Sequence, residues 1–261
     1  MNGKTAMITG GASGIGRNTA FSLAEKGFSL ALNYRNSERE ANSLANELTD
    51  KFGTTNLVFK GDVANKDDCE RMVCEVLGSF SRIDVLIHNA GPYIYERKKM
   101  ADYSFKEWNY IINGNLSAVF YLTKLLLPGM RNNKWGRIIT MGYDRAENAP
   151  GWIYRSAFAA AKTGLASLTR TIALEEAENG ITANMVCPGD IVKEWKEKGI
   201  KEAKESNVEN SPVGRPGTGE DVSRVITFLT EKESDFITGS VIPVTGGSDV
   251  LGKIFRIDDS F

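Results

Sequence analysis

The chain contains little histidine, little cysteine and no long apolar run. Its 261 residues include one histidine and three cysteines, Cys69, Cys74 and Cys187. So few cysteines, odd in number, form no disulfide framework and fit a reducing compartment, so we expect a cytoplasmic protein. With a single histidine, we expect no metal site. The apolar runs are far shorter than the roughly 20 residues of a membrane-spanning helix, and no apolar signal segment opens the sequence, so no membrane association is expected.

Neither sign of charge is in excess. The chain has 32 basic and 33 acidic residues, a net charge of −1. A dedicated nucleic-acid binder usually carries a basic excess, so we expect no nucleic-acid partner. Hydrophobic residues make up 41%, which is in the range of globular proteins. Because no repeat, linker or shift in composition divides the chain, we predict a single domain over residues 1–261.

Strand-like and helix-like segments alternate almost to the end of the chain. The predicted strands are Thr5–Thr9, Ser29–Tyr34, Leu57–Gly61, Ile83–His88, Gly136–Met141, Ile181–Cys187 and Val241–Val244. The predicted helices are Ile15–Lys26, Ser37–Phe52, Lys66–Phe80, Asn115–Met130, Ser156–Asn179 and Gly219–Leu229. Such alternation indicates parallel strands joined by right-handed crossovers, with helices on both faces of the sheet. We therefore predict an α/β fold, a doubly wound Rossmann-type domain with a seven-stranded parallel sheet.

A glycine-rich stretch, Thr9–Gly16, joins the first strand to the first helix. Glycine at such a turn allows a tight bend and lets a pyrophosphate approach the backbone closely. The helix start adds unpaired N–H groups and a partial positive charge, which favour an anion. The stretch therefore predicts a dinucleotide cofactor, bound by Gly10, Ser13, Gly14, Ile15 and Gly16.

The end of the second strand indicates which dinucleotide binds. NAD enzymes usually place an acid there for the ribose hydroxyls, but no acidic residue occurs before Glu38. Arg35, with Arg17 and Ser13, could instead contact a 2′-phosphate, because the planar guanidinium matches phosphate oxygens. We therefore predict NADP(H) rather than NAD(H). The alternative is that both arginines are only solvated surface charges.

Further motifs follow in a fixed order along the chain. They are Asp62-Val63, His88-Asn89-Ala90-Gly91, Asn115-Leu116-Ser117, Lys162, Pro188-Gly189, and Ile237-Thr238-Gly239 with Gly246-Gly247. With the glycine turn, they resemble the short-chain dehydrogenase/reductase family over essentially the whole chain, above all the branch of 3-oxoacyl-acyl-carrier-protein reductases. The resemblance implies that Asp62 and Val63 contact the adenine. It also implies that the cofactor is lined by Asn89, Ala90, Gly91, Lys162, Pro188, Gly189 and Ile191.

The same resemblance implies a catalytic set from which this chain departs. In the family a tyrosine four residues before the lysine donates a proton, a serine polarises the substrate oxygen, and an asparagine holds a water. Here Phe158 stands at the tyrosine position and Tyr143 at the serine position, while Lys162 and Asn115 remain. Phenylalanine has no proton to give. Lys193 also stands where a threonine often contacts the nicotinamide amide.

Several explanations of these departures stay open. Tyr143 or Tyr154 could be a relocated proton donor, similar to the shifted tyrosine of the enoyl reductases in this family. Tyr143 and Asp144 could form an acid–base pair, as in its pteridine reductases. Catalysis could also be lost, leaving an NADP(H)-binding sensor or partner subunit. An engineered change at Phe158 is the remaining explanation, and the accompanying Tyr143 argues against it.

The expected activity is the NADP(H)-dependent reduction of a carbonyl, 3-oxoacyl-type or another ketone, or of an activated double bond. The substrate is a small molecule or an acyl chain, and Tyr93, Tyr95 and the segment Arg97–Lys99 are expected to contact it. The resemblance also implies a homo-oligomer, a dimer or tetramer, with the two long helices and the segment to Phe261 at its interfaces. The charged stretch Lys193–Asn210 is either a lid or a solvated surface helix.

Overall fold

Seven parallel strands form the sheet of this computed structural model, which describes residues 3–206 and 211–248. Their order across the sheet is β3-β2-β1-β4-β5-β6-β7. The strands are β1 (Thr5–Ile8), β2 (Ser29–Tyr34), β3 (Asn56–Lys60), β4 (Val85–His88), β5 (Gly136–Met141), β6 (Ile181–Pro188) and β7 (Val241–Val244). This arrangement confirms the predicted doubly wound fold.

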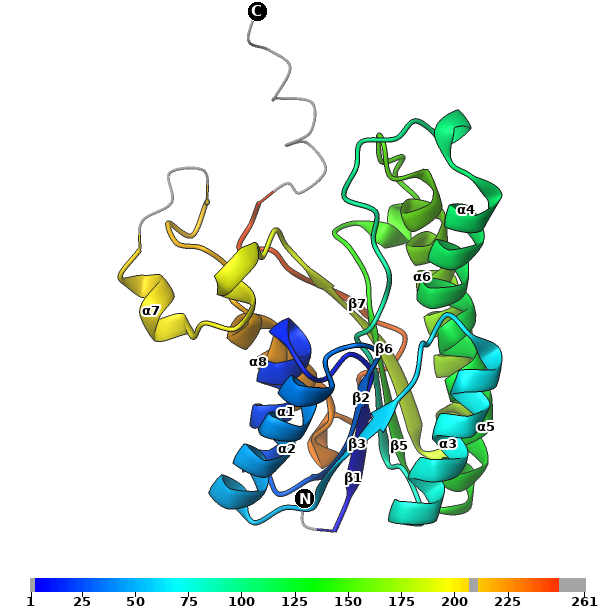
Figure 1. Ribbon diagram of the computed structural model, residues 1–261, viewed down its shortest axis with the longest axis vertical. Helices are drawn as coiled ribbons and strands as arrows, with labels where there is room; N and C mark the ends of the chain where they lie inside the picture. Colours follow the sequence, from blue (N-terminus) through cyan, green and yellow to red (C-terminus); the bar gives the residue numbers. More distant parts are fainter. Residues whose placement is uncertain (1–2, 207–210, 249–261) are drawn as a thin grey trace, which may run out of the picture.

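Helices cover both faces of the sheet (Figure 1). On one face lie α1 (Gly14–Glu25), α2 (Glu38–Phe52) and α8 (Gly219–Leu229). The opposite face carries α3 (Lys66–Phe80), α5 (Ala118–Asn132) and α6 (Ser156–Glu176), with α4 (Phe105–Ile112) beside α6. The short helix α7 (Ile200–Lys204) stands apart from both layers, above α1 and α8 in this view. No helix among residues 3–206 and 211–248 has the length and hydropathy needed to cross a membrane.

The central strands are buried on both faces, which explains their unbroken apolar sequences. Successive side chains of a strand point to opposite faces. Ile8 and Ile87 therefore join the core beneath α1, α2 and α8, whereas Met7 and Leu86 join the core beneath α3 and α5. All four residues are 0% exposed. Burial on both faces fixes the register of β1 and β4, and with it the positions of the loops that follow them.

The strand order reverses between β1 and β4, so their following loops diverge at the carboxyl edge of the sheet. The Thr9 amide donates to the Ile87 carbonyl at 3.0 Å, and Asn89 Nδ2 donates to the Thr9 carbonyl at 3.0 Å. In open parallel sheets ligands bind at such a switch point, outside the carboxyl ends of the strands. The glycine turn therefore opens into this crevice.

A helix that the sequence analysis did not predict precedes the predicted helix Asn115–Met130. It is α4, whose Ser104 side chain caps the Glu107 amide while the Glu107 carboxylate accepts from the Ser104 amide. A π-helical turn, η2 (Asn113–Ser117), joins α4 to α5. Such wide turns occur often at functional sites, and this one carries Asn115.

Candidate active site

The glycine turn is held in shape by contacts that leave no room for side chains. Gly10 and Gly14 have φ angles of +62° and +58°, in the left-handed region that glycine favours. A Cβ atom added to Gly16 would lie 2.2 Å from the Gly10 carbonyl oxygen. Asn89 Nδ2 donates to that same oxygen at 3.0 Å, and the Gly10 amide donates to Asn33 Oδ1 at 3.2 Å. The turn is therefore tied to β2 and to the loop after β4.

The first turn of α1 can accept an anion. Ser13 precedes the helix, and its side chain makes no capping hydrogen bond, which leaves the first amides of the helix available. One of them, the Gly14 amide, donates to Glu197 Oε1 at 2.8 Å. A carboxylate from the segment after β6 thus occupies part of the position where a diphosphate is predicted.

A cavity of about 340 Å³ lies beside the turn, where the adenosine of the predicted cofactor is expected. The predicted residues that line it are Gly10, Ser13, Arg35, Asp62, Val63, Ala90 and Gly91. Arg35 Nη1 lies 3.6 Å from Asp62 Oδ2. A smaller recess next to it is lined by Ser13, Arg35, Asn36 and Ser37 among others. Arg17 lines neither cavity and instead pairs with Glu47 at 2.9 Å.

A larger cleft of about 640 Å³ continues from the switch point toward the start of α6. The predicted residues that line it are Ile15, Asn89, Gly91, Asn115, Tyr143, Lys162, Pro188, Gly189 and Ile191. Five aromatic side chains also form its wall: Tyr93, Tyr95, Tyr143, Trp152 and Phe158. The cleft therefore joins a polar end, formed around Lys162 and Asn115, to an aromatic wall.

Lys162 is the buried cation of this cleft. It is 5% exposed, and burial lowers the pKa of its ammonium group from 10.5 to about 8. Its Nζ lies 5.5 Å from the centre of the Phe158 ring. Within the described ranges it makes neither a hydrogen bond nor an ion pair. A buried ammonium without a partner is costly, so a ligand with oxygen acceptors would stabilise this arrangement.

Asn115 is a second buried group without a full set of partners. Its Nδ2 donates to the Pro92 carbonyl at 2.8 Å and to the Ile111 carbonyl at 3.0 Å. Its Oδ1 is buried and has no hydrogen-bond partner in the described part of the chain. A Cβ atom on Gly91 would lie 2.3 Å from that oxygen. The oxygen of Asn115 is thus fixed in place and available to a ligand or a water.

The structure separates the two predicted proton donors. Tyr143 lines the cleft but is 3% exposed, and burial raises the pKa of its phenol. Its hydroxyl lies 3.3 Å from the Pro150 carbonyl and 3.3 Å from Thr163 Oγ1. Tyr154 is not among the residues described as lining the cleft, and its backbone is left-handed, with φ 62°. Of the two phenols, only Tyr143 belongs to the cleft wall.

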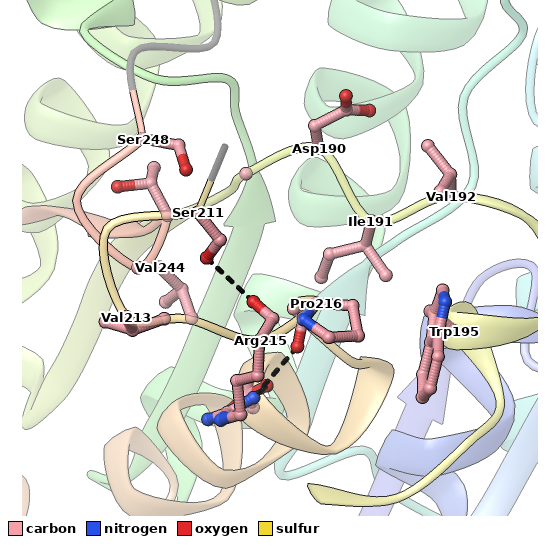
Figure 2. A pocket seen from close by; sticks show the side chains of 15 residues that line it. Asp190, Ile191, Val192, Trp195, Ser211, Val213, Arg215, Pro216, Val244 and Ser248 are labelled. Carbon is pink, nitrogen blue, oxygen red and sulfur yellow. Dashed lines mark hydrogen bonds and ion pairs between the residues drawn. The ribbon is translucent and has the colours of Figure 1, made fainter. Parts of the chain in front are cut away.

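Another cavity, of about 250 Å³, is also lined by the segment after β6 (Figure 2). Ile191 lines both this cavity and the cleft. Beneath it, Arg215 forms a bidentate ion pair with Asp221, with distances of 2.8 and 2.7 Å. In Figure 2 the Asp190 side chain points away from Arg215. The ion pair fixes the start of α8 and so supports the wall that carries Ile191.

Three parts of the predictions for this region lie outside the described residues. They are the side chain of Lys193, residues 207–210 of the charged stretch, and the segment from residue 249 to Phe261. The described part of that stretch contains a 3₁₀ turn, Lys193–Lys196, followed by α7. Whether it acts as a lid stays a prediction.

The sequence analysis missed Arg155. This residue lines the cleft and immediately precedes α6. A cation at the N-terminus of a helix is disfavoured by the helix dipole, so its presence there is a signal that the side chain has a specific partner. One partner is Tyr93, whose hydroxyl oxygen accepts from Arg155 Nε at 2.5 Å.

Comparisons with known proteins relate this chain to reductases. A family model described as enoyl-(acyl carrier protein) reductase matches residues 10–249. A candidate oxidoreductase of Bacillus subtilis, YtkK, is 53% identical over 95% of this chain and 97% of its own. The 3-oxoacyl-[acyl-carrier-protein] reductase FabG of Staphylococcus epidermidis is 34% identical over 94% of this chain and 98% of its own.

Solved structures give the same result. A candidate 3-oxoacyl-reductase from Bacillus thuringiensis superposes with a TM-score of 0.88 at 49% identity, over 95% of this chain and 99% of that one. A blue fluorescent protein from a metagenomic library, in complex with NADPH, superposes with a TM-score of 0.82 at 29% identity, over 94% and 98%. Because sequence and fold both match over nearly the whole length, the chain belongs to the short-chain dehydrogenase/reductase family of oxidoreductases, in the branch that contains the 3-oxoacyl-[acyl-carrier-protein] reductases.

Proposed function

We propose that the protein is an NADP(H)-dependent reductase of a carbonyl, 3-oxoacyl-type or another ketone, or of an activated double bond. The observation that carries this proposal is the pair of buried polar groups without partners, the Lys162 ammonium and Asn115 Oδ1. Both line a single cleft that begins at the glycine turn. Uncompensated buried polar groups are retained where a ligand uses them.

Each part of the site has a distinct task in this proposal. When bound, NADP(H) supplies the hydride. The amides at the start of α1 hold the diphosphate, and Lys162 donates hydrogen bonds to the nicotinamide ribose. Asn115 Oδ1 holds a water for proton relay. The aromatic wall excludes bulk water from the substrate and packs against its apolar part.

NADP(H) is the cofactor that the recess beside Arg35 favours. The recess offers the Ser13 hydroxyl and the Arg35 guanidinium, and none of its lining residues is acidic. The reductase relatives and the structural neighbour in complex with NADPH support the same assignment. Arg17 is engaged with Glu47, so we assign the 2′-phosphate to Arg35 and Ser13 only.

Phe158 makes the proton donor atypical in this proposal. Tyr143 and Tyr154 are the donors that the sequence nominates, and Tyr143 is the one that lines the cleft. The second candidate function follows from the same residue: a member of the family that binds NADP(H) without turnover, as a sensor or a partner subunit.

The two functions differ in turnover. Purified protein would be titrated with NADPH and NADH by calorimetry, then mixed with NADPH and a panel of 3-oxoacyl thioesters, ketones and enones while NADPH absorbance is followed. We expect tighter binding of NADPH, and turnover with at least one substrate. NADPH binding without any turnover would favour the non-catalytic function.

The preference for NADPH over NADH can be tested with one variant and a matched control. Arg35→Ala should weaken NADPH binding about tenfold and leave NADH binding nearly unchanged, since a charge-assisted hydrogen bond to phosphate is lost. Arg170→Ala, an exposed arginine on α6, should change neither. An equal loss for both cofactors would contradict the role of Arg35.

We further propose a homo-oligomer that uses the outer surfaces of α5 and α6. Phe120 on α5 is 50% exposed and Leu174 on α6 is 82% exposed, and apolar side chains of this size are typical of interfaces when they lie together. Sedimentation of the purified protein tests this, and a monomer at micromolar concentration would contradict it.

A further inference from the structure

We infer that Tyr93 is the catalytic proton donor of this protein, with Arg155 as the residue that positions it. The inference rests on the proposed reductase function and names a phenol that the sequence did not nominate as a donor. It explains how proton transfer can continue in a cleft whose lysine faces a phenylalanine.

Tyr93 lies next to the ring that cannot donate. Its ring centre is 5.0 Å from that of Phe158, and the two planes meet at 85°, an edge-to-face contact. The Phe158 ring in turn lies 5.5 Å from Lys162 Nζ. Tyr93 is half-buried and lines the same cleft as both residues. A phenol is therefore present one ring away from the position of Phe158, on the aromatic wall of the cleft.

The hydrogen bond from Arg155 makes the phenolic oxygen of Tyr93 a hydrogen-bond acceptor. A guanidinium has donors and no acceptor, so Tyr93 Oη accepts the 2.5 Å hydrogen bond from Arg155 Nε. The phenolic hydrogen is then directed elsewhere, and no acceptor for it occurs within residues 3–206 and 211–248. A cation that donates to the oxygen also stabilises the phenolate that remains after the proton has left.

Arg155 is itself held in place by the loop that carries Tyr93. Its Nη1 donates to the Glu96 carbonyl at 2.8 Å and to the Tyr154 carbonyl at 2.9 Å, and its Nη2 donates to the Tyr95 carbonyl at 3.1 Å. The guanidinium carbon lies 4.9 Å from the centre of the Tyr93 ring. These contacts fasten the loop after β4 to the start of α6. Tyr93, which lines the cleft, is thus held in one position by Arg155.

The other phenols of this region fit the role less well. The Tyr143 hydroxyl is 3.3 Å from both the Pro150 carbonyl and Thr163 Oγ1, and the residue is 3% exposed. Tyr154 is not among the described residues of the cleft wall. Tyr95 lines the cleft but is 78% exposed. Only Tyr93 combines a place in the cleft with a cationic donor on its oxygen.

The step balances with NADPH as the reductant. The substrate carbonyl carbon receives a hydride from NADPH, which becomes NADP⁺. The electron pair of the carbonyl π bond moves to the oxygen, which forms a new O–H bond with the proton of Tyr93 Oη. The O–H bond of Tyr93 breaks. The phenolate, stabilised by Arg155, regains a proton from solvent at the mouth of the cleft. The net reaction is ketone, NADPH and one proton to alcohol and NADP⁺.

The test compares single substitutions that each remove one phenolic hydroxyl and keep the aromatic ring. Tyr93→Phe, Tyr95→Phe, Tyr143→Phe and Tyr154→Phe would each be assayed for NADPH consumption with the best substrate of the panel, and for NADPH affinity by calorimetry. We expect Tyr93→Phe to lower kcat by about 10²–10⁴, the usual contribution of a positioned acid, while NADPH affinity and the circular dichroism spectrum stay unchanged. Tyr95→Phe and Tyr143→Phe keep the rings of the cleft wall and should lose far less kcat than Tyr93→Phe, and Tyr154→Phe, outside the described wall, should stay within about threefold.

Two results would overturn the inference in distinguishable ways. If Tyr93→Phe keeps more than half of the wild-type kcat, or if another of the three variants shows the large loss, the donor is not Tyr93 and the reductase function stands. If the wild-type protein binds NADPH but reduces no member of the panel, the reductase function fails, and the donor role fails with it.

Discussion

The side chain of Glu197, from the segment after β6, lies at the start of α1, where its Oε1 accepts a 2.8 Å hydrogen bond from the Gly14 amide. Next to it, the Lys196 carbonyl accepts from Asn18 Nδ2 at 2.8 Å. The segment after β6 is therefore fastened across the amides that are predicted to hold a diphosphate. An anion of the chain and an anion of the cofactor compete for the same positive end of α1.

Removing this carboxylate should improve cofactor binding. In Glu197→Gln the competing negative charge is gone, so we expect the Kd for NADPH to fall by about two- to fivefold, the scale of an exposed charge interaction. Glu194→Gln is the matched control, because Glu194 and Glu197 both line a pocket beside Gly14, but Glu194 makes no hydrogen bond to the Gly14 amide. Calorimetric titration at low salt measures both. Weaker binding by Glu197→Gln would show that the carboxylate assists the cofactor instead.

Gly16→Ala should abolish cofactor binding. The new Cβ would lie 2.2 Å from the Gly10 carbonyl oxygen and 2.8 Å from Asn89 Nδ2, so the turn or the helix must move. Gly78→Ala on α3 is the control, because nothing lies within 4 Å of its added Cβ. We expect Gly78→Ala to bind NADPH normally and to be more stable by roughly 0.5–1 kcal/mol. Normal NADPH titration by Gly16→Ala would contradict the close packing of the turn.

Lys162→Met should lose turnover and gain stability. The pKa of Lys162 is about 8 in the folded protein and 10.5 in the unfolded chain. Between these values the unfolded state binds more protons, so wild-type stability rises as the pH rises from 8 to 10.5. Methionine avoids the cost of a buried charge, so the variant should be more stable by a few kcal/mol at pH 7, and this advantage should shrink toward pH 10.5.

Thermal melts from pH 6 to pH 10 of Lys162→Met check this prediction. Lys106→Met, on the exposed side of α4, controls for the loss of one positive charge. If Lys162→Met is less stable than the wild type at every pH, the prediction is wrong, because a partner then stabilises the ammonium charge of Lys162 in the folded protein.

His88 should stay neutral far below the usual range of histidine. Burial, with a smaller contribution from the Lys162 charge, lowers its pKa from 6.5 to about 3. The unfolded chain therefore binds this proton first, and the free energy of unfolding should fall as the pH drops from 6.5 to 3. Since the chain has one histidine, its imidazole resonances are unambiguous. They should not shift between pH 8 and 5, and a midpoint near pH 6.5 would contradict the burial.

His88→Gln supplies the matching stability measurement. His88 Nε2 lies 3.1 Å from Thr123 Oγ1, and glutamine can replace this hydrogen bond without titrating. The variant should show a shallower loss of stability than the wild type as the pH falls from 6.5. Identical acid melts would mean that the carboxylates alone govern unfolding in this range.

The fold could be predicted because its signals are local. The alternating apolar segments and the glycine turn depend on residues that are neighbours in the sequence, and the strands lie within a residue or two of their predicted positions. The helix α4 was missed, although Ser104 and Glu107 form a capping box that the sequence contains. The one-domain extent of residues 1–261 and the oligomeric state stay predictions.

The candidate site could be predicted only in part. Lys162 and Asn115 were predicted as site residues because each lies in a motif at a fixed place in the chain, and the structure places both in the cleft wall. Tyr143 was nominated as a donor because it stands at the serine position, and Tyr154 because it precedes Lys162 by eight residues. Neither position along the chain says which way a side chain points, and of these two phenols only Tyr143 lies in the cleft wall.

The order of strands and helices, the dinucleotide turn and the absence of a phenol at position 158 are properties of the sequence alone, because each depends on a residue and its near neighbours. The tertiary structure decided which charged and phenolic groups meet. Arg155 and Tyr93 are 62 positions apart, and Glu197 and Gly14 are 183 apart. Contacts over such separations depend on how loops pack at the carboxyl edge of the sheet, and no spacing along the chain encodes that packing.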